Sequence, residues 1–591
     1  MSQIEPELTT TQHAMLVVWG QYAQQLGIIQ RVQAITVHQK TRTHSPQTKV
    51  LAFLVALLAG LPHLKDISHA AHPLDQDEAV ARAWQQPAWA DYSGVSRTLQ
   101  ALTQAEVDQV VGVLDTASQP FIDQEVMLAI KDQGGLVYDG DLTGRPVSNT
   151  STTYPNVAYG HMSDGLHLGY QAALVSLHSP SYGRLWLSVQ SHAGDTVSCT
   201  QANALAQAAE GKTGVRPRRR TELLRERLQT AEAELQQAQS QLDQARTTLT
   251  ETQARREQTQ AQRQSWREKE SLLAADDHAH ERPERPHSQL AQARAKVDVY
   301  QRRQARQAKV IDQAERRVNR RQAHLRGVQA QHTLLQQRLA QFEQDNAANP
   351  SPIQAVFRLD AGFGTPDNVA LLIEMGYDIY TKPYSHRVTT GLRRRVSPET
   401  SWTRVGANAE MIAWAAISLA KYPYPLDVAL ERFHTGETIR YSTLLHYGTD
   451  PVTTDLPTWF RQYNGRQTIE AGIKEGKQVF QMHHLKVRAK PALDLQEHFA
   501  VFAANFVRWA AHWLTTQCRH VATDDPILAH LGVKALIQVV AHTSAYVVRQ
   551  DGHCSVRFSE HSLFAGQGLE TRDWAFQLPL PLFKSCVFAP I

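Results

Sequence analysis

Four reactive side chains near residue 470 have the spacing of a single helix face. They are Tyr463, Arg466, Glu470 and Lys477. On a helix that turns by about 100° per residue, all four fall within about 60° of arc, whereas Glu475 points elsewhere. A carboxylate flanked by a phenol, a guanidinium and an ammonium suits a metal ion beside a phosphate. A surface helix with unrelated charges is the commoner origin of such a set, so the interpretation needs further acids.

Three aspartates upstream supply such acids. Asp139 and Asp141 lie two residues apart in an expected strand, so both face the same side. Asp360 ends or follows another expected strand, just before a Gly-containing turn. Carboxylates at strand ends, together with one on a later helix, can hold two divalent ions that promote phosphodiester attack. Strand aspartates alone are common, so the prediction depends on whether three acids converge.

The segments around these acids predict an α/β core. Residues 135–143 have the composition of a strand, and 167–177 and 183–192 give two more. Strand patterning resumes at 355–363 and again at 378–382. These segments are expected to form one sheet that carries the acids.

The N-terminal part of the chain, residues 1 to about 130, has apolar residues at helical spacing and predicts a helical domain. Its longest apolar stretch, Val50–Leu61, is too short to span a membrane, and no secretory leader opens the chain. The four cysteines form no Cys-x-x-Cys pair, which argues against structural zinc and indicates a reducing compartment. We therefore expect a cytoplasmic protein with no membrane partner. Its net charge of +4 permits nucleic acid as a partner.

Two long helical runs, 219–274 and 288–345, interrupt the core pattern. In the first run, leucines recur every seven residues from Leu228 to Leu249, with small residues between them. This pattern predicts an antiparallel coiled-coil hairpin, inserted between the strands of the core. The arginines of the second run are compatible with contacts to DNA phosphates. A solvated coiled-coil face explains them about as well.

The last third of the chain carries the remaining elements. Residues 387–457 alternate polar and apolar side chains and predict a small β-rich insertion. One helix is expected from about Leu456 to Gln478, and a strongly apolar one over 495–514.

The polar blocks resemble those of a known family. Tyr463, Arg466, Glu470 and Lys477 are separated by two, three and six residues. This spacing resembles the Tyr-Arg-Glu-Lys signature of DDE transposases of bacterial insertion sequences, in the group of insertion-sequence family four and family 1380. The segments 137–143 and 357–363 resemble the blocks around the first and second aspartates of that family. The resemblance covers three ordered blocks between about residues 135 and 515 and leaves out the coiled coil.

The resemblance implies a fold and a set of site residues. The fold would be α/β, with an RNase-H-like (retroviral-integrase-like) catalytic core. Asp141, Asp360 and Glu470 would be the catalytic residues and would hold two Mg²⁺ ions, for which Mn²⁺ can substitute. Asp141 is preferred over Asp139 because its Asp-x-Thr pattern resembles the first catalytic strand of integrase-like folds, but the choice between the two stays open. The DNA-binding residues would be Tyr463, Arg466 and Lys477.

The expected domain organisation follows from these patterns. It comprises a helical DNA-binding domain (1–130), the first part of the core (131–215), the coiled-coil hairpin (216–349), the second part of the core with its β-rich insertion (350–515, insertion about 387–457) and an α+β tail (516–591).

The same resemblance implies cut-and-paste DNA transposition. The partners would be double-stranded DNA, namely terminal inverted repeats and target DNA, and a second copy of the chain in a homodimeric synaptic complex. Such a protein would be cytoplasmic and nucleoid-associated. One alternative is an RNase-H-like endonuclease without strand transfer. Another is a non-catalytic DNA-binding protein in which the coiled coil is the functional part.

Overall fold

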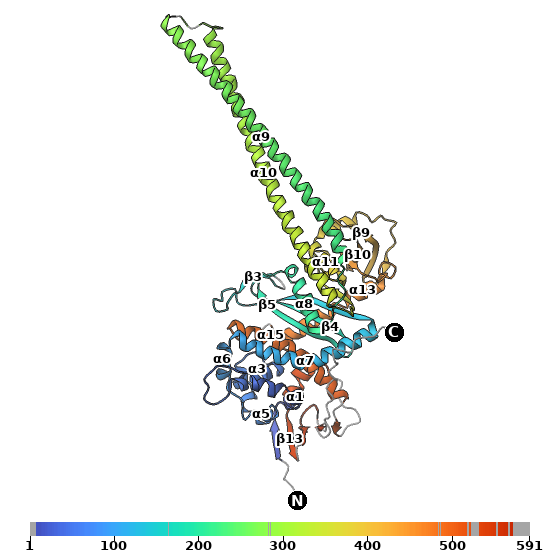
Figure 1. The fold of residues 1–591 in the computed structure, drawn as a ribbon. Coiled ribbons are helices and arrows are strands. Elements are labelled where there is room, and N and C mark those ends of the chain that lie inside the picture. Colours follow the sequence, from blue (N-terminus) through green and yellow to red (C-terminus); the bar gives the residue numbers. More distant parts are fainter. Residues whose placement is uncertain are drawn as a thin grey trace. The chain divides into compact units, whose positions relative to one another are not determined.

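The structure is a computed structural model. It describes residues 7–162, 165–281, 283, 285–482, 484, 486–516, 519–521, 531–550, 553–564 and 568–570. The chain divides into two compact units, one of residues 1–218 with 349–591 and the other of residues 219–348. The larger unit is mixed α/β with a mixed sheet, and the smaller is a pair of long helices (Figure 1).

Helices account for most of residues 14–133. Their starts follow local capping chemistry: the Ser45 side chain accepts the Thr48 N–H, and Thr103 and Glu106 form a capping box. The longest of these helices ends at Gly134, whose φ of 73° is left-handed. The helices are α1 (Ala14–Gln25), α2 (Ile28–Ala34), α3 (Pro46–Leu58), α4 (Asp66–His69), α5 (Glu78–Ala83), α6 (Tyr92–Gln100) and α7 (Gln104–Gln133), with the short 3-10 turn η1 (Leu74–Gln76).

The N-terminal helices share their core with the C-terminal part of the chain. Strand β1 (Glu7–Thr11) pairs antiparallel with β13 (Ala545–Gln550). Helix α15 (Lys490–Thr516) packs against α3 and α7. The sequence pattern predicts three separate regions here: an N-terminal domain, the second part of the core, which includes most of α15, and a tail, which includes β13. These regions pack together because α3 is almost entirely apolar and is buried on all sides. The other N-terminal helices bury only part of its surface, and α15 buries more of it.

A large mixed sheet forms the centre of the larger unit. Its order is β3-β4-β2-β6-β7-β11-β10-β9-β8, with β5 beside β4. Strands β2, β6 and β7 are parallel, and the other pairings are antiparallel. The strands are β2 (Gly135–Pro146), β3 (Ala158–Met162), β4 (Gly165–Ser179), β5 (Gly183–Ala193), β6 (Gln354–Arg358), β7 (Asp378–Thr381), β8 (Thr403–Arg404), β9 (Ala409–Ile417), β10 (Leu426–Thr435) and β11 (Thr438–Tyr447).

The expected β-rich insertion extends this sheet. β11 pairs with β7 through Tyr447↔Ile379, so strands β8–β11 continue the central sheet. The first expected strand residues, 387–393, instead belong to helix α12 (His386–Arg393). The β pattern therefore predicted the strands β9 to β11 but not their attachment, because pairing partners far apart in the sequence leave no local signal.

Helices cover the sheet. Ten consecutive residues of β4, from Leu168 to Leu177, are buried, so both faces of this strand are packed. Helices α7, α8 (Ala202–Thr213) and α15 contact this part of the sheet. The remaining helices are α11 (Pro366–Glu374), α13 (Leu456–Asn464), α14 (Gln467–Gln478) and α16 (Val533–Gln538), with 3-10 turns η2 (Ser198–Thr200), η3 (Ala361–Phe363) and η5 (Val540–His542).

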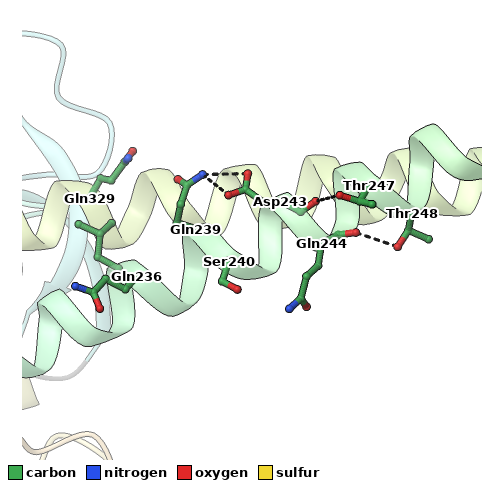
Figure 2. Close-up of a pocket in the computed structure, with 9 residues that line it drawn as sticks. Gln236, Gln239, Ser240, Asp243, Gln244, Thr247, Thr248 and Gln329 are labelled. Atoms are coloured by element: carbon green, nitrogen blue, oxygen red, sulfur yellow. Dashed lines mark hydrogen bonds between the residues drawn. The ribbon is translucent and has the colours of Figure 1, made fainter.

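The smaller unit consists of helices α9 (Thr221–Ala279) and α10 (Gln289–Ala347), each of 59 residues, which pack against each other along their length. At about 1.5 Å per residue each is about 88 Å long. Small and apolar residues at heptad spacing are buried between the helices, including Ala238 and Leu242, which pack with Leu325. At the base, the Arg219 guanidinium pairs with Asp345 at 2.9 Å. Figure 2 shows the polar surface of α9 around Gln239–Thr248.

A second sheet gathers the chain ends that the structure describes. Its order is β1-β13-β14-β15-β12, with β12 (Arg519–Val521), β14 (His553–Phe558) and β15 (Gly568–Glu570). The expected α+β tail falls partly on residues 522–530 and 571–591, which lie outside the described residues. Among the helices that are described, none combines the length and the apolar character needed to cross a membrane.

A candidate active site of three carboxylates

Two neighbouring parallel strands bring the first two acids to one place. The register of β2 on β6 pairs Asp139 with Arg358. Asp141 and Asp360 each come two residues later, so they reach the same level along the sheet. β2 continues through Asp141, whereas β6 has ended and Asp360 precedes the η3 turn. The ends of parallel strands are places where loops and side chains can form a site, because the chain there is released from the ladder.

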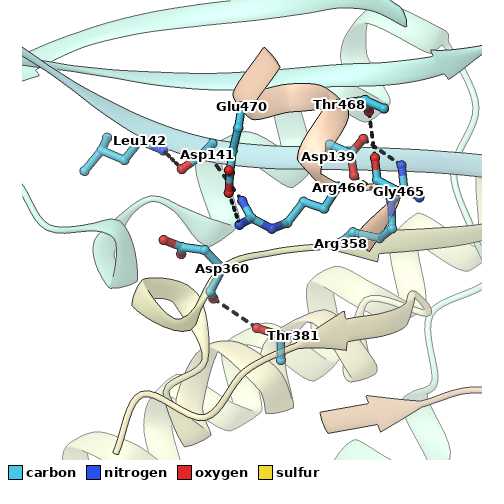
Figure 3. Close-up of polar contacts among 10 residues, drawn as sticks. All are labelled: Asp139, Asp141, Leu142, Arg358, Asp360, Thr381, Gly465, Arg466, Thr468 and Glu470. Atoms are coloured by element: carbon cyan, nitrogen blue, oxygen red, sulfur yellow. Dashed lines mark hydrogen bonds and ion pairs between the residues drawn. The ribbon is translucent and has the colours of Figure 1, made fainter. Parts of the chain in front are cut away.

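The third acid comes from α14, which packs against β2. Glu470 lies in the first turn of this helix and points toward Asp141, as Figure 3 shows. Asp141, Asp360 and Glu470 line one cavity of about 990 Å³. Arg466 and Lys477 line the same cavity. The structure therefore brings together five of the six residues that the sequence singled out.

Arg466 lies between the acids. Its guanidinium is 3.3 Å from Asp141 Oδ2 and 2.5 Å from Glu470 Oε1 (Figure 3). The Arg466 side chain is 10% exposed, whereas that of Glu470 is 54% exposed and reaches the open side of the cavity. Arg466 thus interacts electrostatically with all three carboxylates, and the second cation, Lys477, also lines the cavity.

The cavity holds more negative charge than its own cations balance. Burial, with the neighbouring charge of Asp360, raises the pKa of Asp141 to about 7, although Arg466 opposes the rise. Burial likewise raises the pKa of Asp360 against the opposing charge of Arg466. The Asp360 Oδ1 atom is buried and has no hydrogen-bond partner among the residues that the structure describes. Carboxylates with raised pKa values in a cleft are typical of functional sites. A bound cation would relieve the repulsion between them.

The donor set fits a hard divalent cation. Carboxylate oxygens are the ligands that Mg²⁺ prefers, usually one or two from the protein with water and phosphate completing the shell. Asp141, Asp360 and Glu470 would supply them, and the unpartnered Asp360 Oδ1 is available for this. Within the described ranges, no three His, Cys, Asp or Glu side chains are already close enough together to hold a metal. Asp141 accepts from the Leu142 N–H at 2.8 Å and from the Arg466 guanidinium, and Glu470 accepts from the same guanidinium.

Asp139 has a different environment from Asp141. Both its oxygens accept from Arg358, at 2.7 Å and 2.8 Å, and the pair is almost completely buried. Arg358 also donates to the Gln462 carbonyl at 3.0 Å. Asp139 is absent from the lining of the cavity. The two aspartates lie on the same face of β2, but Arg358, on the neighbouring strand, binds only Asp139.

The expected single helix over 456–478 is wrong in one respect. Helices α13 and α14 are separated at Gly465 and Arg466, where the Arg466 N–H bonds to the Tyr463 carbonyl at 3.0 Å, three residues back. Tyr463 is not among the residues that line the cavity, although its ring lies 6.0 Å from the Arg466 guanidinium. A side chain at residue 465 would place its Cβ 2.3 Å from Arg358 Nη1, so any larger residue would displace this buried guanidinium.

Tyr463 packs inside the protein. Its ring is 5% exposed and belongs to a hydrophobic cluster that includes Trp459, Leu444 and Met411. Burial raises the pKa of Tyr463 above its usual range. Its expected contact with DNA phosphate stays a prediction. The expectation that Glu475 points away from the site is confirmed, because Glu475 pairs with Arg508 of α15 at 2.7 Å.

Two charged residues behind the site were missed in the sequence. The Lys382 ammonium lies 5.2 Å from the centre of the Tyr463 ring and 3.7 Å from Glu431. Glu431 is 1% exposed, and burial raises its pKa against the opposing charge of Lys382. A signal existed, because Glu431 interrupts the apolar run of β10 (Val428–Leu430). A charge in an otherwise buried strand indicates a partner.

Comparison with known proteins gives no independent information about the site. No protein-family model matches the chain, and no curated protein matches it. The features that bear on function are therefore the convergence of the carboxylates, their raised pKa values and the cations beside them.

Proposed function

We propose that the chain is a DDE-type transposase that cuts and rejoins DNA with an RNase-H-like core. The observation that carries the proposal is the convergence of Asp141, Asp360 and Glu470 in one cavity from three separate segments. These segments are a central strand, the end of the adjacent parallel strand and a later helix. This is the combination that the resemblance to insertion-sequence transposases requires.

The strand arrangement supports the proposed core. β5, β4 and β2 are successive antiparallel neighbours, and β6 and β7 follow on the other side of β2, parallel to it. In this reading the helical hairpin and strands β8–β11 are additions to the core. The first addition enters between β5 and β6, and the second follows β7.

The residues of the cavity have distinct parts in the proposed reaction. Two divalent ions, Mg²⁺ or Mn²⁺, held by the three acids would activate water or a 3′-hydroxyl and stabilise the leaving oxygen. Lys477 and Arg466 would hold the phosphate backbone of the transposon end, since guanidinium and ammonium groups bind phosphate by charge-assisted hydrogen bonds. Arg466 would have to exchange its carboxylate contacts for phosphate contacts when DNA binds. The expected homodimer and the reading of terminal inverted repeats belong to this proposal.

The test is cleavage of duplex DNA that carries the sequences flanking the open reading frame, in Mg²⁺. The wild type is expected to cut at both ends, and Asp360→Ala is expected to bind the ends without cutting them. Cleavage by Asp360→Ala would reject the site. Cutting without joined products in a target-plasmid assay would favour the endonuclease alternative.

A matched pair on α14 tests the helix contribution. Glu470→Gln is expected to abolish cleavage, because Glu470 faces the cavity. Glu475→Gln makes the same chemical change five residues later, outside the cavity, and is expected to retain cleavage. Binding of the ends without cutting by the wild type would move the non-catalytic DNA-binding alternative ahead.

A further inference from the structure

One stretch of α10 carries a dense set of cations. Residues 302–320 contain seven basic side chains and two acids, Asp312 and Glu315. All seven basic side chains are exposed. We call them the basic stripe: Arg302, Arg303, Arg306, Lys309, Arg316, Arg317 and Arg320.

The stripe lies on one side of the helix. The buried seam toward α9 runs through Ile311 and Ala314. At the coiled-coil period of 3.5 residues per turn, the seven cations fall within about 100° of arc around the α10 axis. This arc begins on the side of α10 opposite α9 and extends to one flank of the helix. Asp312 and Glu315 fall on the other flank. Both acids therefore lie outside the arc of the seven cations, and Asp312 borders it.

Most cations of the stripe lack an acidic partner. Arg316 pairs with Asp312 at 3.1 Å. Within the described part of the chain, no salt bridge joins a carboxylate to any of the other six. Elsewhere on the hairpin several arginines have acidic partners: Arg225 pairs with Glu343, Arg246 with Asp243 and Arg255 with Glu251. A coiled coil that needed cations only for solubility would interleave them with acids in the same way.

A second hairpin is a poor partner for this surface. The acids of α9 are spaced along the whole helix, and the segment drawn in Figure 2 carries one of them, Asp243. There Asp243 accepts from the Gln239 amide at 3.1 Å, and the Thr247 and Thr248 hydroxyls bond to carbonyls of their own helix. No acidic stripe on α9 matches the cationic face of α10.

We propose that the basic stripe binds the sugar–phosphate backbone of duplex DNA without reading its sequence. From Arg302 to Arg320 the stripe is about 27 Å long at about 1.5 Å per residue. This length corresponds to about eight base pairs at the roughly 3.4 Å spacing of each strand. Arginine forks suit phosphate oxygens, and backbone contacts give affinity and orientation without base readout. The choice of duplex DNA as the polyanion rests on the proposed function, whereas the binding face follows from the charges alone.

The test uses the full chain in EDTA with a labelled duplex of about 40 base pairs and random sequence. Affinity is measured by fluorescence anisotropy over about 50–200 mM salt, where phosphate contacts dominate the dependence. The stripe variant is Arg302→Gln, Arg306→Gln and Arg320→Gln. The control variant is Arg225→Gln, Arg246→Gln and Arg255→Gln, which makes the same change in net charge on the same hairpin. Glutamine has nearly the helix propensity of arginine, so both variants should keep the hairpin folded, as circular dichroism would verify.

The stripe variant is expected to lose affinity on the order of 10- to 100-fold at the lowest salt. Its slope of log K against log salt should fall by about 2 to 3, at about 0.9 for each lost contact. The control variant should match the wild type within about twofold. Equal losses in the two variants would overturn the proposal. Tighter binding of a single-stranded RNA of the same length, with the same loss in the stripe variant, would overturn the choice of duplex DNA.

A footprint gives a second, independent readout. Lys309 lies in the stripe and Lys269 lies on the other helix, where its ammonium is 5.0 Å from the Trp266 ring centre. The duplex is expected to protect Lys309, but not Lys269, from acetylation. Absence of protection at Lys309 would count against the stripe. Both measurements omit divalent metal and the element's end sequences, so a failure of the proposed catalytic function would leave their outcome unchanged.

Discussion

Replacing Asp139 and Asp141 in turn by Asn should have opposite effects on stability. The two substitutions are chemically identical and lie two residues apart on one strand. Asp139 is the carboxylate of a buried ion pair, whereas Asp141 is a buried carboxylate facing other acids. The pair of variants therefore tests whether the environment of each side chain, rather than the motif, decides its role.

The magnitude for Asp139→Asn follows from its partner. The side chain of Arg358 is 5% exposed and donates two hydrogen bonds to the Asp139 carboxylate. Removing the charge leaves a buried guanidinium whose remaining contact is the Gln462 carbonyl. Breaking a buried pair in this way costs about 3–5 kcal/mol. We expect the lower end, about 3 kcal/mol, because an Asn oxygen can still accept one bond.

Asp141→Asn is expected to change the free energy of unfolding in the opposite direction. In the absence of metal, burial beside Asp360 raises the pKa of Asp141 from 3.8 to about 7, so the folded chain binds this proton more tightly than the unfolded chain. The wild type therefore loses stability as the pH rises from about 4 to 7. At about 1.36 kcal/mol per pKa unit the loss is at most about 4 kcal/mol. Asp141→Asn removes it and should be more stable than the wild type at pH 8, but not at pH 4.

The assay is urea unfolding in EDTA at pH 4 and pH 8, followed by tryptophan fluorescence. Most of the tryptophans lie in the larger unit, so the signal reports on the fold that contains the site. Cleavage in Mg²⁺ is measured in parallel: Asp141→Asn should be inactive although stable, and residual activity of folded Asp139→Asn should exceed it. If Asp141→Asn unfolds at lower urea than the wild type at pH 8, the electrostatic reasoning is refuted.

Three further predictions concern the elements that hold the site. Gly465→Ala should destabilise the protein by about 1–3 kcal/mol, because its Cβ would displace Arg358, and combining it with Asp139→Asn should cost less than the two separate losses together. Trp509→Ala should cost about 3–5 kcal/mol in urea unfolding, since its ring stacks on Phe121 at 4.2 Å and is 1% exposed; a loss under about 1 kcal/mol would mean that α15 is not anchored in this way. Tyr463→Phe should keep the urea midpoint near the wild-type value, because the ring is in a hydrophobic cluster. A fall in cleavage alone would assign the phenol a part in the site, either in holding Arg466 or in contacting DNA.

The sequence alone determined much of the local structure. Heptad spacing predicted the two long helices of residues 219–347. The a/d repeat is visible within the sequence of each helix, and the residues of this repeat are the ones that pack between the helices. Strand composition likewise located β2, β4, β5, β6 and β7. The acids could be named in advance because a carboxylate at a strand end and a Glu among cations on a helix are visible as types and spacings.

Only the tertiary structure decided which acids act together. Asp139 and Asp141 are equivalent in the strand pattern, and the difference arises because Arg358, 219 residues away, lies at the paired position of β6. Arg358 also approaches Gly465 at the break between α13 and α14, and Tyr463 of α13 belongs to the hydrophobic core. Pairing of β1 with β13 and of β11 with β7 also joins distant segments. Burial and charge at a site depend on neighbours from across the chain, and a local pattern carries no information about which neighbour arrives.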